Sequence, residues 1–470
     1  MKSRGMGWIG FLGALLMANA AGADNAHLMQ LIEILHKKGT LTQEEYQLLR
    51  NAATTPPAES AQATPPAAVA PPAATASKAA EPAVTVSSEG GLKVKSQDGA
   101  SEFTVGGRVQ VDGGFYRDDR ADHANGTELR RARLDVGGKI EKDWKFKLAF
   151  DYADNAVEDK AAYIAYGGWK AATLKAGLFT PPFTLSEAGS SLFGIFMEEA
   201  MLVNAFKPDD RIGIGLESSG DHWSAQMAIF GEGGASNDVD DEGSGASARL
   251  TWAPIAEKGR LLHLGGTVIY QTPDSAAEAG TDRNGNRVTT DNVTVARFRA
   301  RPEAHVGTVR MVDTRTLYNV DSWTSYGLES AAVWGPFSVE GEYVVTQLAR
   351  DLRQPDLRFG GYYGSVSWFP TGESRNYEVK SGGFDRVKPL ENFNLKTGGT
   401  GAWELAARYS HLDLADKNVD GGEESNVTFG INWYLNPHLR MMANYVLADA
   451  FRGGRHDEPN LLESRVQVDF

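Results

Sequence analysis

The chain has 470 residues, a formal net charge of −14 and no cysteine. The lack of cysteine excludes disulfides and thiolate metal sites, and it argues against a lipid anchor on an N-terminal cysteine. The acidic charge is a sum over the whole chain and says little about any one surface. With 52 Gly, 20 Phe and 15 Tyr, the chain is nonetheless polar on average, because its mean hydropathy is −0.35.

The N-terminus predicts export. Lys2 and Arg4 precede an apolar run over residues 6–18, and small residues follow up to Ala23. This pattern indicates a cleavable secretory signal peptide over residues 1–23. No other run approaches the roughly 18 apolar residues that a membrane-spanning helix needs. A membrane location would therefore require strands.

The next two segments are expected to lie outside the main domain. Residues 24–50 have apolar residues at helical spacing, beginning with Leu28 and Leu31, and predict a periplasmic helical segment. Its apolar stripe fits either an oligomeric coiled coil or a helix hairpin. Residues 51–90 are rich in Pro, Ala, Thr and Ser and predict an extended linker.

From residue 91 to residue 470 the dominant signal is alternation of apolar and polar residues, which indicates β-strands. The last strand is the clearest example, since Val466, Val468 and Phe470 share one face while Arg465 and Gln467 share the other. Tryptophans cluster at strand ends, and short turns alternate with long loops. These features predict an all-β, transmembrane antiparallel β-barrel in the bacterial outer membrane. A soluble β-sandwich is the alternative, but it would not need so many apolar outer faces.

Several stretches, in order, resemble the phosphate-selective porin O and P family over about residues 100–470. They are Leu129–Leu134, Gly137-Gly138, Lys142–Lys145, Leu174–Phe179, Thr371–Glu373, Gly401–Leu405, Arg408-Tyr409, Asn432–Tyr434 and Ala443–Val446. The resemblance implies a barrel of 16 strands, usually a homotrimer in outer-membrane lipid, with one loop folded into the lumen. It also implies conduction of phosphate, pyrophosphate or polyphosphate.

One candidate anion site is the segment around Arg297, Arg299 and Arg301. In an extended segment these arginines share one face at a spacing of about 7 Å. Their mutual repulsion requires solvent or an anion between them, and the resemblance implies an arginine ladder leading into the pore. The alternative is an ordinary solvated loop face beside Glu303.

A second group of candidates lies on two early strands. Strand alternation turns Arg131 and Arg133 inward and places Arg130 on the opposite face, whereas the resemblance places Arg130 and Arg131 together in the lumen. Lys145 and Lys147 are also expected to point inward, and the resemblance puts Lys145 near the constriction. Ordinary lumen charge is the alternative for both lysines.

The constriction loop is expected over residues 181–210, and here the chain departs from the family. In phosphate-selective members a lysine follows the Leu185-Ser186 position, but here that residue is Glu187, followed by Ser190 and Ser191. Replacing a cation by a carboxylate changes the local charge by two and disfavours anions. We expect Glu187 to pair with Lys145 or an arginine and to leave a less discriminating pore.

The sequence therefore predicts a passive outer-membrane channel for inorganic phosphate or other small anions, with no catalysis, cofactor, metal or nucleic-acid partner. A general or sugar-preferring porin is the nearer alternative, for which Tyr362, Tyr363 and Trp368 could form a stacking track. A barrel enzyme is the remote one, since no nucleophile motif is evident. The acidic residues 238–242 are interpreted as a solvated loop and not as a cation site.

Overall fold

The structure is a computed structural model that describes residues 85–87, 91–121, 124–153, 156–231, 243–273, 275–281 and 287–470. All of them belong to one unit, Ala80–Phe470. The predicted signal peptide, the helical segment 24–50, most of the linker 51–90 and the acidic residues 238–242 lie outside the described residues. They stay predictions.

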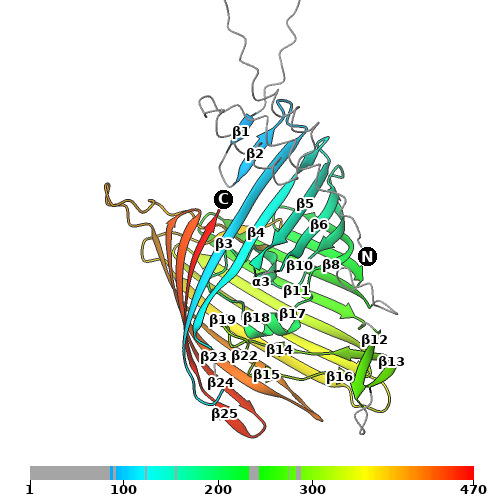
Figure 1. The fold of residues 1–470 in the computed structure, drawn as a ribbon. Helices are drawn as coiled ribbons and strands as arrows, with labels where there is room; N and C mark the ends of the chain where they lie inside the picture. The colour runs from blue at the N-terminus through cyan, green and yellow to red at the C-terminus, as the bar shows by residue number, and fades with distance from the viewer. Residues whose placement is uncertain are drawn as a thin grey trace, which may run out of the picture. The chain divides into compact units, whose positions relative to one another are not determined.

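The unit is a closed antiparallel β-barrel, and the described residues contain its sixteen wall strands (Figure 1). The wall strands are β3 (Glu102–Arg117), β4 (Gly126–Ile140), β5 (Trp144–Asp151), β6 (Glu158–Tyr166), β7 (Thr173–Phe179), β8 (Arg211–Ser219), β9 (Trp223–Gly231), β10 (Ser244–Glu257), β11 (Arg260–Gln271), β17 (Val320–Trp334), β18 (Phe337–Arg350), β19 (Leu357–Trp368), β22 (Ala402–Asp416), β23 (Val419–Asn436), β24 (Leu439–Arg452) and β26 (Asn460–Asp469). The predicted fold class and strand number are confirmed.

The ring closes where β26 pairs with β3, from Asn460 opposite Arg117 to Asp469 opposite Arg108. Beyond this point the backbone of Phe470 exchanges hydrogen bonds with Gly107. Strand β2 (Leu92–Lys95) continues the pairing along β3, and β1 (Thr85–Ser87) pairs with β2. Strand β25 (Arg455–Asp457) extends β24 at the opposite end. Closure leaves no free edge along the wall, which a strand in lipid requires.

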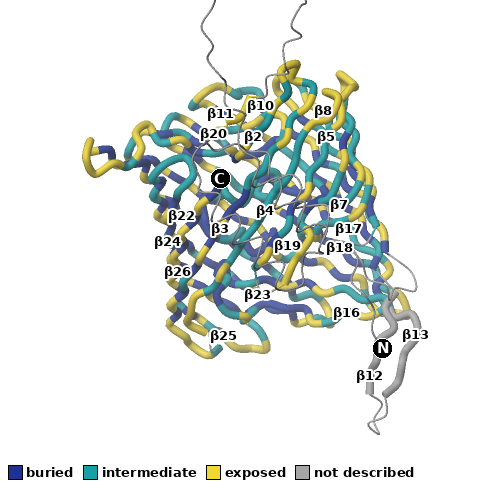
Figure 2. Tube along the Cα trace, turned by 45° about the horizontal axis from the view of Figure 1, so that its top comes forward, coloured by how far each residue is buried: buried dark blue, intermediate teal, exposed yellow. Residues whose placement is uncertain are grey.

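Exposed and buried residues alternate along the wall strands (Figure 2), and this separates an outer face from an inner face. On β26, Val466 and Val468 are exposed on the outside, whereas Glu463, Arg465 and Gln467 are buried inside. Exposed tryptophans line the barrel near the end that carries β1, β2 and Phe470: Trp144, Trp223, Trp252, Trp334, Trp368 and Trp403. Such a band is typical of a membrane–water interface. No helix among the described residues is long and apolar enough to span a membrane.

The connections differ between the two ends of the barrel. At the end that carries Phe470 most are short turns, such as residues 258–259 and 335–336, which marks this end as periplasmic. The exception is the connection from β19 to β22, residues 369–401, which contains the small hairpin β20 (Asn376–Glu378) and β21 (Gly383–Asp385). This long periplasmic turn was not expected from the sequence.

Three connections fold into the lumen, namely the periplasmic connection 369–401, the loop between β7 and β8 and the loop between β11 and β17. The loop between β7 and β8 contains two short helices, α3 (Leu185–Ala188) and α4 (Met201–Phe206). The loop between β11 and β17 contains β12 (Ser275–Thr281), β13 (Arg287–Ala296), β14 (Arg299–Ala300), β15 (Val312–Asp313) and β16 (Leu317–Tyr318). Helix α4 packs on β14 and on the inner faces of β18, β19 and β22, and α3 contacts β21. The apolar core of the unit therefore lies inside the barrel and holds the loops in place.

Candidate functional site

The candidate site is a cavity of about 680 Å³ in the lumen. Its walls are the inner faces of β3 to β7 on one side and the loop between β7 and β8 on the other. Acidic and basic side chains line it in equal number. The lining includes the predicted residues Arg130, Arg131, Arg133, Glu187, Ser190, Ser191 and Arg301. The fold thus brings most of the sequence-predicted site residues to one space.

Arg130 and Arg131 both face the lumen because strand β4 contains a β-bulge. Arg131 pairs with Gln110 and Leu129 pairs with Val111, so Arg130 has no opposite residue. The extra residue shifts the alternation by one, and it leaves Leu129 exposed on the outer face. The expectation from alternation, that Arg130 lies on the opposite face, is therefore wrong, because it assumed a regular strand.

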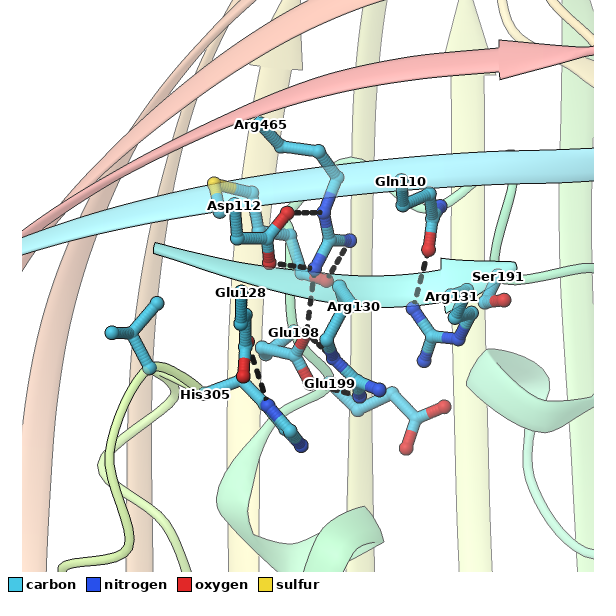
Figure 3. Close-up of polar contacts among 12 residues, drawn as sticks. Gln110, Asp112, Glu128, Arg130, Arg131, Ser191, Glu198, Glu199, His305 and Arg465 are labelled. Atoms are coloured by element: carbon cyan, nitrogen blue, oxygen red, sulfur yellow. Dashed lines mark hydrogen bonds and ion pairs between the residues drawn. The ribbon is translucent and has the colours of Figure 1, made fainter. Parts of the chain in front are cut away.

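Arg130 anchors the loop between β7 and β8, which the sequence predicts to be the constriction loop and which we call by that name, to the wall (Figure 3). Its Nε and Nη2 donate to the two carboxylate oxygens of Glu198 at 2.9 and 3.0 Å. Arg465 of β26 also donates to Glu198, at 2.8 Å, and it makes a two-pronged pair with Asp112 at 2.7 Å for each contact. A planar guanidinium suits this geometry because it presents two parallel N–H groups to a carboxylate. The charge of Arg130 is therefore used within the protein.

Two other guanidinium groups in the cavity are held by neutral side chains. Arg131 donates through Nη1 to the amide oxygen of Gln110 at 2.7 Å, and Arg108 of β3 donates through Nη1 to the hydroxyl of Ser191 at 2.9 Å. Neutral partners orient these cations without cancelling their charge. Arg131 and Arg108 are therefore the cations of the cavity best suited to meet an anion. Ser190 makes only a local contact, because its hydroxyl accepts from the amide of Leu192 at 3.3 Å.

Arg133 and Lys147 lie in the cavity but are paired with carboxylates of the wall. Arg133 donates to Asp151 at 3.2 and 3.3 Å, and the ammonium of Lys147 lies 3.6 Å from Asp135. Both lysines of β5 point inward, as predicted, since Lys145 and Lys147 line lumen cavities.

Lys145 lines a second cavity of about 540 Å³ on the periplasmic side. It is within electrostatic reach of Lys139 and Lys380, two further cations of that cavity. The constriction loop reaches this second cavity with Leu192. The two cavities share four residues of the wall, namely Asp135, Lys147, Tyr163 and Lys175, so they lie next to each other along this side of the lumen.

The arginines of the segment 297–301 lie on the other inward loop. Phe298 and Ala300 are buried in the apolar core, so Arg297 and Arg299 face away from it and are exposed. Arg297 pairs with Asp313, with 2.8 Å between Nε and Oδ1. This hydrogen bond, against the opposing effect of burial, raises the pKa of Arg297.

Two neighbours complete this segment. The amide of Arg301 donates to Asn204 of α4 at 3.2 Å, which joins the two inward loops. Burial, with repulsion from Arg301, Arg299 and Arg297, lowers the pKa of Arg310 to about 10. Arg310 therefore belongs to the same basic cluster as the three predicted arginines.

Glu303 does not neutralise this row of arginines. It is buried and accepts from Nε of Arg408 at 3.1 Å and from the hydroxyls of Ser410 and Thr428 at 2.5 and 2.6 Å. The carboxylate thus points into the wall of β22 and β23, while the arginines two and four residues earlier stay in the loop. Glu303 therefore binds side chains of the wall and leaves the charges of these arginines unchanged.

Glu187 pairs with a residue that sequence reasoning did not consider. The ammonium of Lys207, which follows α4, lies 3.0 Å from Glu187 and 2.7 Å from Glu199. Glu187 was expected to pair with Lys145 or an arginine, but the fold of the loop brings Lys207 back onto it. The position vacated by the family's lysine therefore holds a carboxylate with a cation of its own.

Arg108, Lys207 and Arg465 were missed as functional residues. The only signal for Arg108 and Arg465 was alternation, which turned them inward without showing what they would contact. Lys207 carried no signal, because its partners depend on the path of the loop.

The barrel, its polar lumen and its inward loops define an outer-membrane porin. The family model described as "Phosphate-selective porin O and P" matches residues 103–470, and the chain belongs to this family. It is thus a protein of the outer membrane of a Gram-negative bacterium.

Two relatives cover most of the chain. Porin O of Pseudomonas aeruginosa is 31% identical over 405 residues, which cover 78% of this chain and 87% of that protein. An uncharacterized protein of Caulobacter vibrioides is 30% identical over 471 residues, 93% of this chain and 89% of its own length. Among solved structures, an anion-selective porin from Comamonas acidovorans has a TM-score of 0.50 at 12% identity and covers 79% of this chain and all of its own. At that identity the likeness shows the fold alone.

Proposed function

We propose that this porin is a passive channel for small anions, with inorganic phosphate or polyphosphate as the solute class. The observation that carries the proposal is the pair Arg131 and Arg108, whose guanidinium groups line the central cavity on neutral partners. Cations of this kind replace part of an anion's hydration shell and repel other cations. Arginine suits phosphate because its planar fork donates to two oxygens at once.

The proposed path runs along one side of the lumen. Anions first meet Arg297, Arg299 and Arg301 on the outer loop, then pass Arg131, Arg130 and Arg133 beside the constriction loop. They leave past Lys145 and its lysine neighbours at the periplasmic end. The two cavities support this path. Arg301 lines the central cavity, Lys145 lines the periplasmic one, and the two cavities share part of their lining. The family name and the printed name of the anion-selective structural relative agree with this class of solute.

The proposal also covers catalysis, cofactors and oligomeric state, as expected for a porin. The channel catalyses no reaction and needs no cofactor, and it works as a homotrimer in outer-membrane lipid. A sugar-preferring pore is not favoured, because Tyr362 and Trp368 are exposed on the outer face and Tyr363 is buried against Glu342. These residues do not form a stacking track.

The test is single-channel recording of the purified protein in a planar bilayer under a KCl gradient, followed by addition of phosphate. We expect an anion-selective reversal potential and a decrease of chloride current at millimolar phosphate. The decrease should be smaller in the variant R131Q. A cation-selective pore, or a current that phosphate does not change, would contradict the assignment to phosphate while leaving the barrel intact.

A further inference from the structure

The constriction loop contains a compact group of three charged side chains that the anion path does not account for. We call Glu187, Glu199 and Lys207 the loop trio. Lys207 lies within 3.0 Å of both carboxylates, and all three side chains line the central cavity. Their side chains are 13%, 25% and 29% exposed, so the trio is mostly shielded yet touches the solvent of the pore.

The two carboxyl groups of the trio lie against the same ammonium, which brings two like charges together in a mostly shielded place. Two carboxylates that share one site repel each other, and this favours a proton on one of them. One ammonium then faces one carboxylate and one neutral acid. In this state the trio has no net charge. Release of the proton gives it one net negative charge in the central cavity.

Charged groups surround the trio on several elements. On the wall strands these groups are Arg130, Arg131, Lys175, Glu342, Tyr363 and Arg408. On the inward segments they are Glu198, Arg301, Glu303, His305, Glu378 and Lys380. Most have partners of their own: Glu198 with Arg130, Lys175 with Glu217, and Glu303 with Arg408. The trio itself contains two acids and one base, and so it can change charge without breaking those pairs.

We propose that the loop trio is a determinant of ion selectivity that acts as a unit: Glu187 and Glu199 hold one proton between them above Lys207, and the pore loses anion preference when that proton leaves. The inference deepens the proposed function, since it assumes that solutes pass the constriction loop. The two tests have different readouts. The proposed function is tested by whether the pore prefers anions or cations, and the loop trio is tested by how that preference changes with pH.

The electrostatics of the loop agree with this assignment. Burial raises the pKa of Glu187 to about 8, and the neighbouring Glu199 adds to the rise while Lys207 opposes it. Burial also acts to raise the pKa of Glu199, but Lys207 and the hydrogen bond from Glu187 outweigh it, so this pKa is lowered. The two carboxylates raise the pKa of Lys207 against the effect of burial. The proton is therefore placed on Glu187, and Lys207 stays charged.

The sign of the effect follows directly. Below pH 8 Glu187 is neutral and the trio adds no net charge to the pore. Above pH 8 it adds one negative charge, which repels anions and attracts cations. Across about 7 Å of partly screened water, one charge changes the anion-to-cation permeability ratio by roughly three- to tenfold. The ratio should fall by this factor between pH 6.5 and pH 9.

The experiment measures reversal potentials of the full-length channel under a KCl gradient from pH 6.5 to pH 9. Four proteins are compared: the unaltered chain, E187Q, E199Q and the control E158Q. Glutamine at position 187 imitates the neutral acid, so E187Q should keep the low-pH selectivity at every pH. Glu158 lines the outer part of the same cavity as an exposed partner of Lys160, 2.6 Å away, and so E158Q removes a charge without touching the trio.

We expect the unaltered channel and E158Q to lose anion selectivity as pH rises and E187Q to stay constant. E199Q should also lose the dependence, because the proton then has no second carboxyl group to bridge. If the unaltered channel shows no dependence on pH, or if E187Q keeps it, the inference is wrong. A pore that prefers cations at every pH would contradict the proposed function, whereas its slope with pH would still test the trio. Migration of the unheated protein as a folded barrel on a gel verifies folding of each variant.

Discussion

The guanidinium of Arg130 donates to both carboxylate oxygens of Glu198, at 2.9 and 3.0 Å, and so ties the constriction loop to wall strand β4. A residue that the resemblance places among the pore's anion contacts is thereby part of the pore's scaffold. The cations left to face a solute are those with neutral partners. Substitutions of the paired residues should therefore change the stability of the barrel, and substitutions of the other cations should change the passage of anions.

Removing Glu198 should loosen the loop. In E198Q, Arg130 and Arg465 lose a charged partner in a largely buried place, and breaking such a pair destabilises by about 3–5 kcal/mol. We expect a lower unfolding temperature of the barrel and larger fluctuations of the open-channel current. The matched control is E257Q, which removes an exposed partner of Arg260 at a periplasmic turn. Equal unfolding temperatures of the two variants would show that Glu198 does not anchor the loop.

Removing Arg131 should weaken anion passage without unfolding the barrel. Its partner Gln110 also bonds to Gln467, so R131Q leaves no charge unpaired. Loss of one positive charge about 6 Å from a passing anion weakens binding by about 1–3 kcal/mol. The phosphate concentration for half block should rise roughly tenfold. R260Q, at the rim of the outer wall, is the control, and a similar rise there would argue against a specific role for Arg131.

Arg299 should affect the rate at which anions enter the pore and not their binding beside the constriction loop. It is exposed on the loop between β11 and β17, where its charge attracts anions from solution. The range of this attraction is the screening length, which shortens as the salt concentration rises. R299Q should lower the rate of phosphate block by a few fold at ~0.05 M salt and hardly at all at ~1 M, where the screening length is about 3 Å. The rates come from the statistics of blocked intervals. A difference that persists at high salt would place Arg299 in direct contact with the solute.

Arg375 should hold the periplasmic turn 369–401 inside the lumen. It pairs with Glu340 at 2.6 Å and stacks on Phe384, whose ring centre is 3.5 Å from the guanidinium carbon. R375A leaves Glu340 without this partner and should destabilise the barrel by about 3 kcal/mol, with a noisier open channel. Thermal unfolding and current noise are the measurements. R120A, in an exposed outer loop, should change neither.

Much of the fold was predictable from the sequence because a barrel wall repeats one local rule. Val466 and Arg465 lie on opposite faces as alternation predicts, and the same rule set the inward positions of Arg131 and Lys147. The rule failed at Arg130, where a bulge shifted the alternation. It was also undecided at Tyr362 and Tyr363, of which the structure turns the first outward and the second inward.

The site was less predictable than the wall, because its partners come from distant parts of the chain. Glu187 and Lys207 meet only because the loop folds back after α4. Ser191 meets Arg108 across 83 positions of sequence. Periodicity carries no information on such contacts. The resemblance supplied the region of the pore but not the charge pairs within it.

The contacts of Arg465 imply an order of assembly. This residue of the last wall strand donates to the carbonyl of Met197 at 2.6 Å and to Glu198 at 2.8 Å, across 268 and 267 positions of sequence. The constriction loop therefore completes its contacts with the wall only when β26 has joined β3. A chain in which that last pairing slips by one residue would turn Arg465 toward lipid and leave Glu198 short of charge. The contacts of this loop are thus completed together with the ring, and its charge pairs depend on the correct register of the last strand.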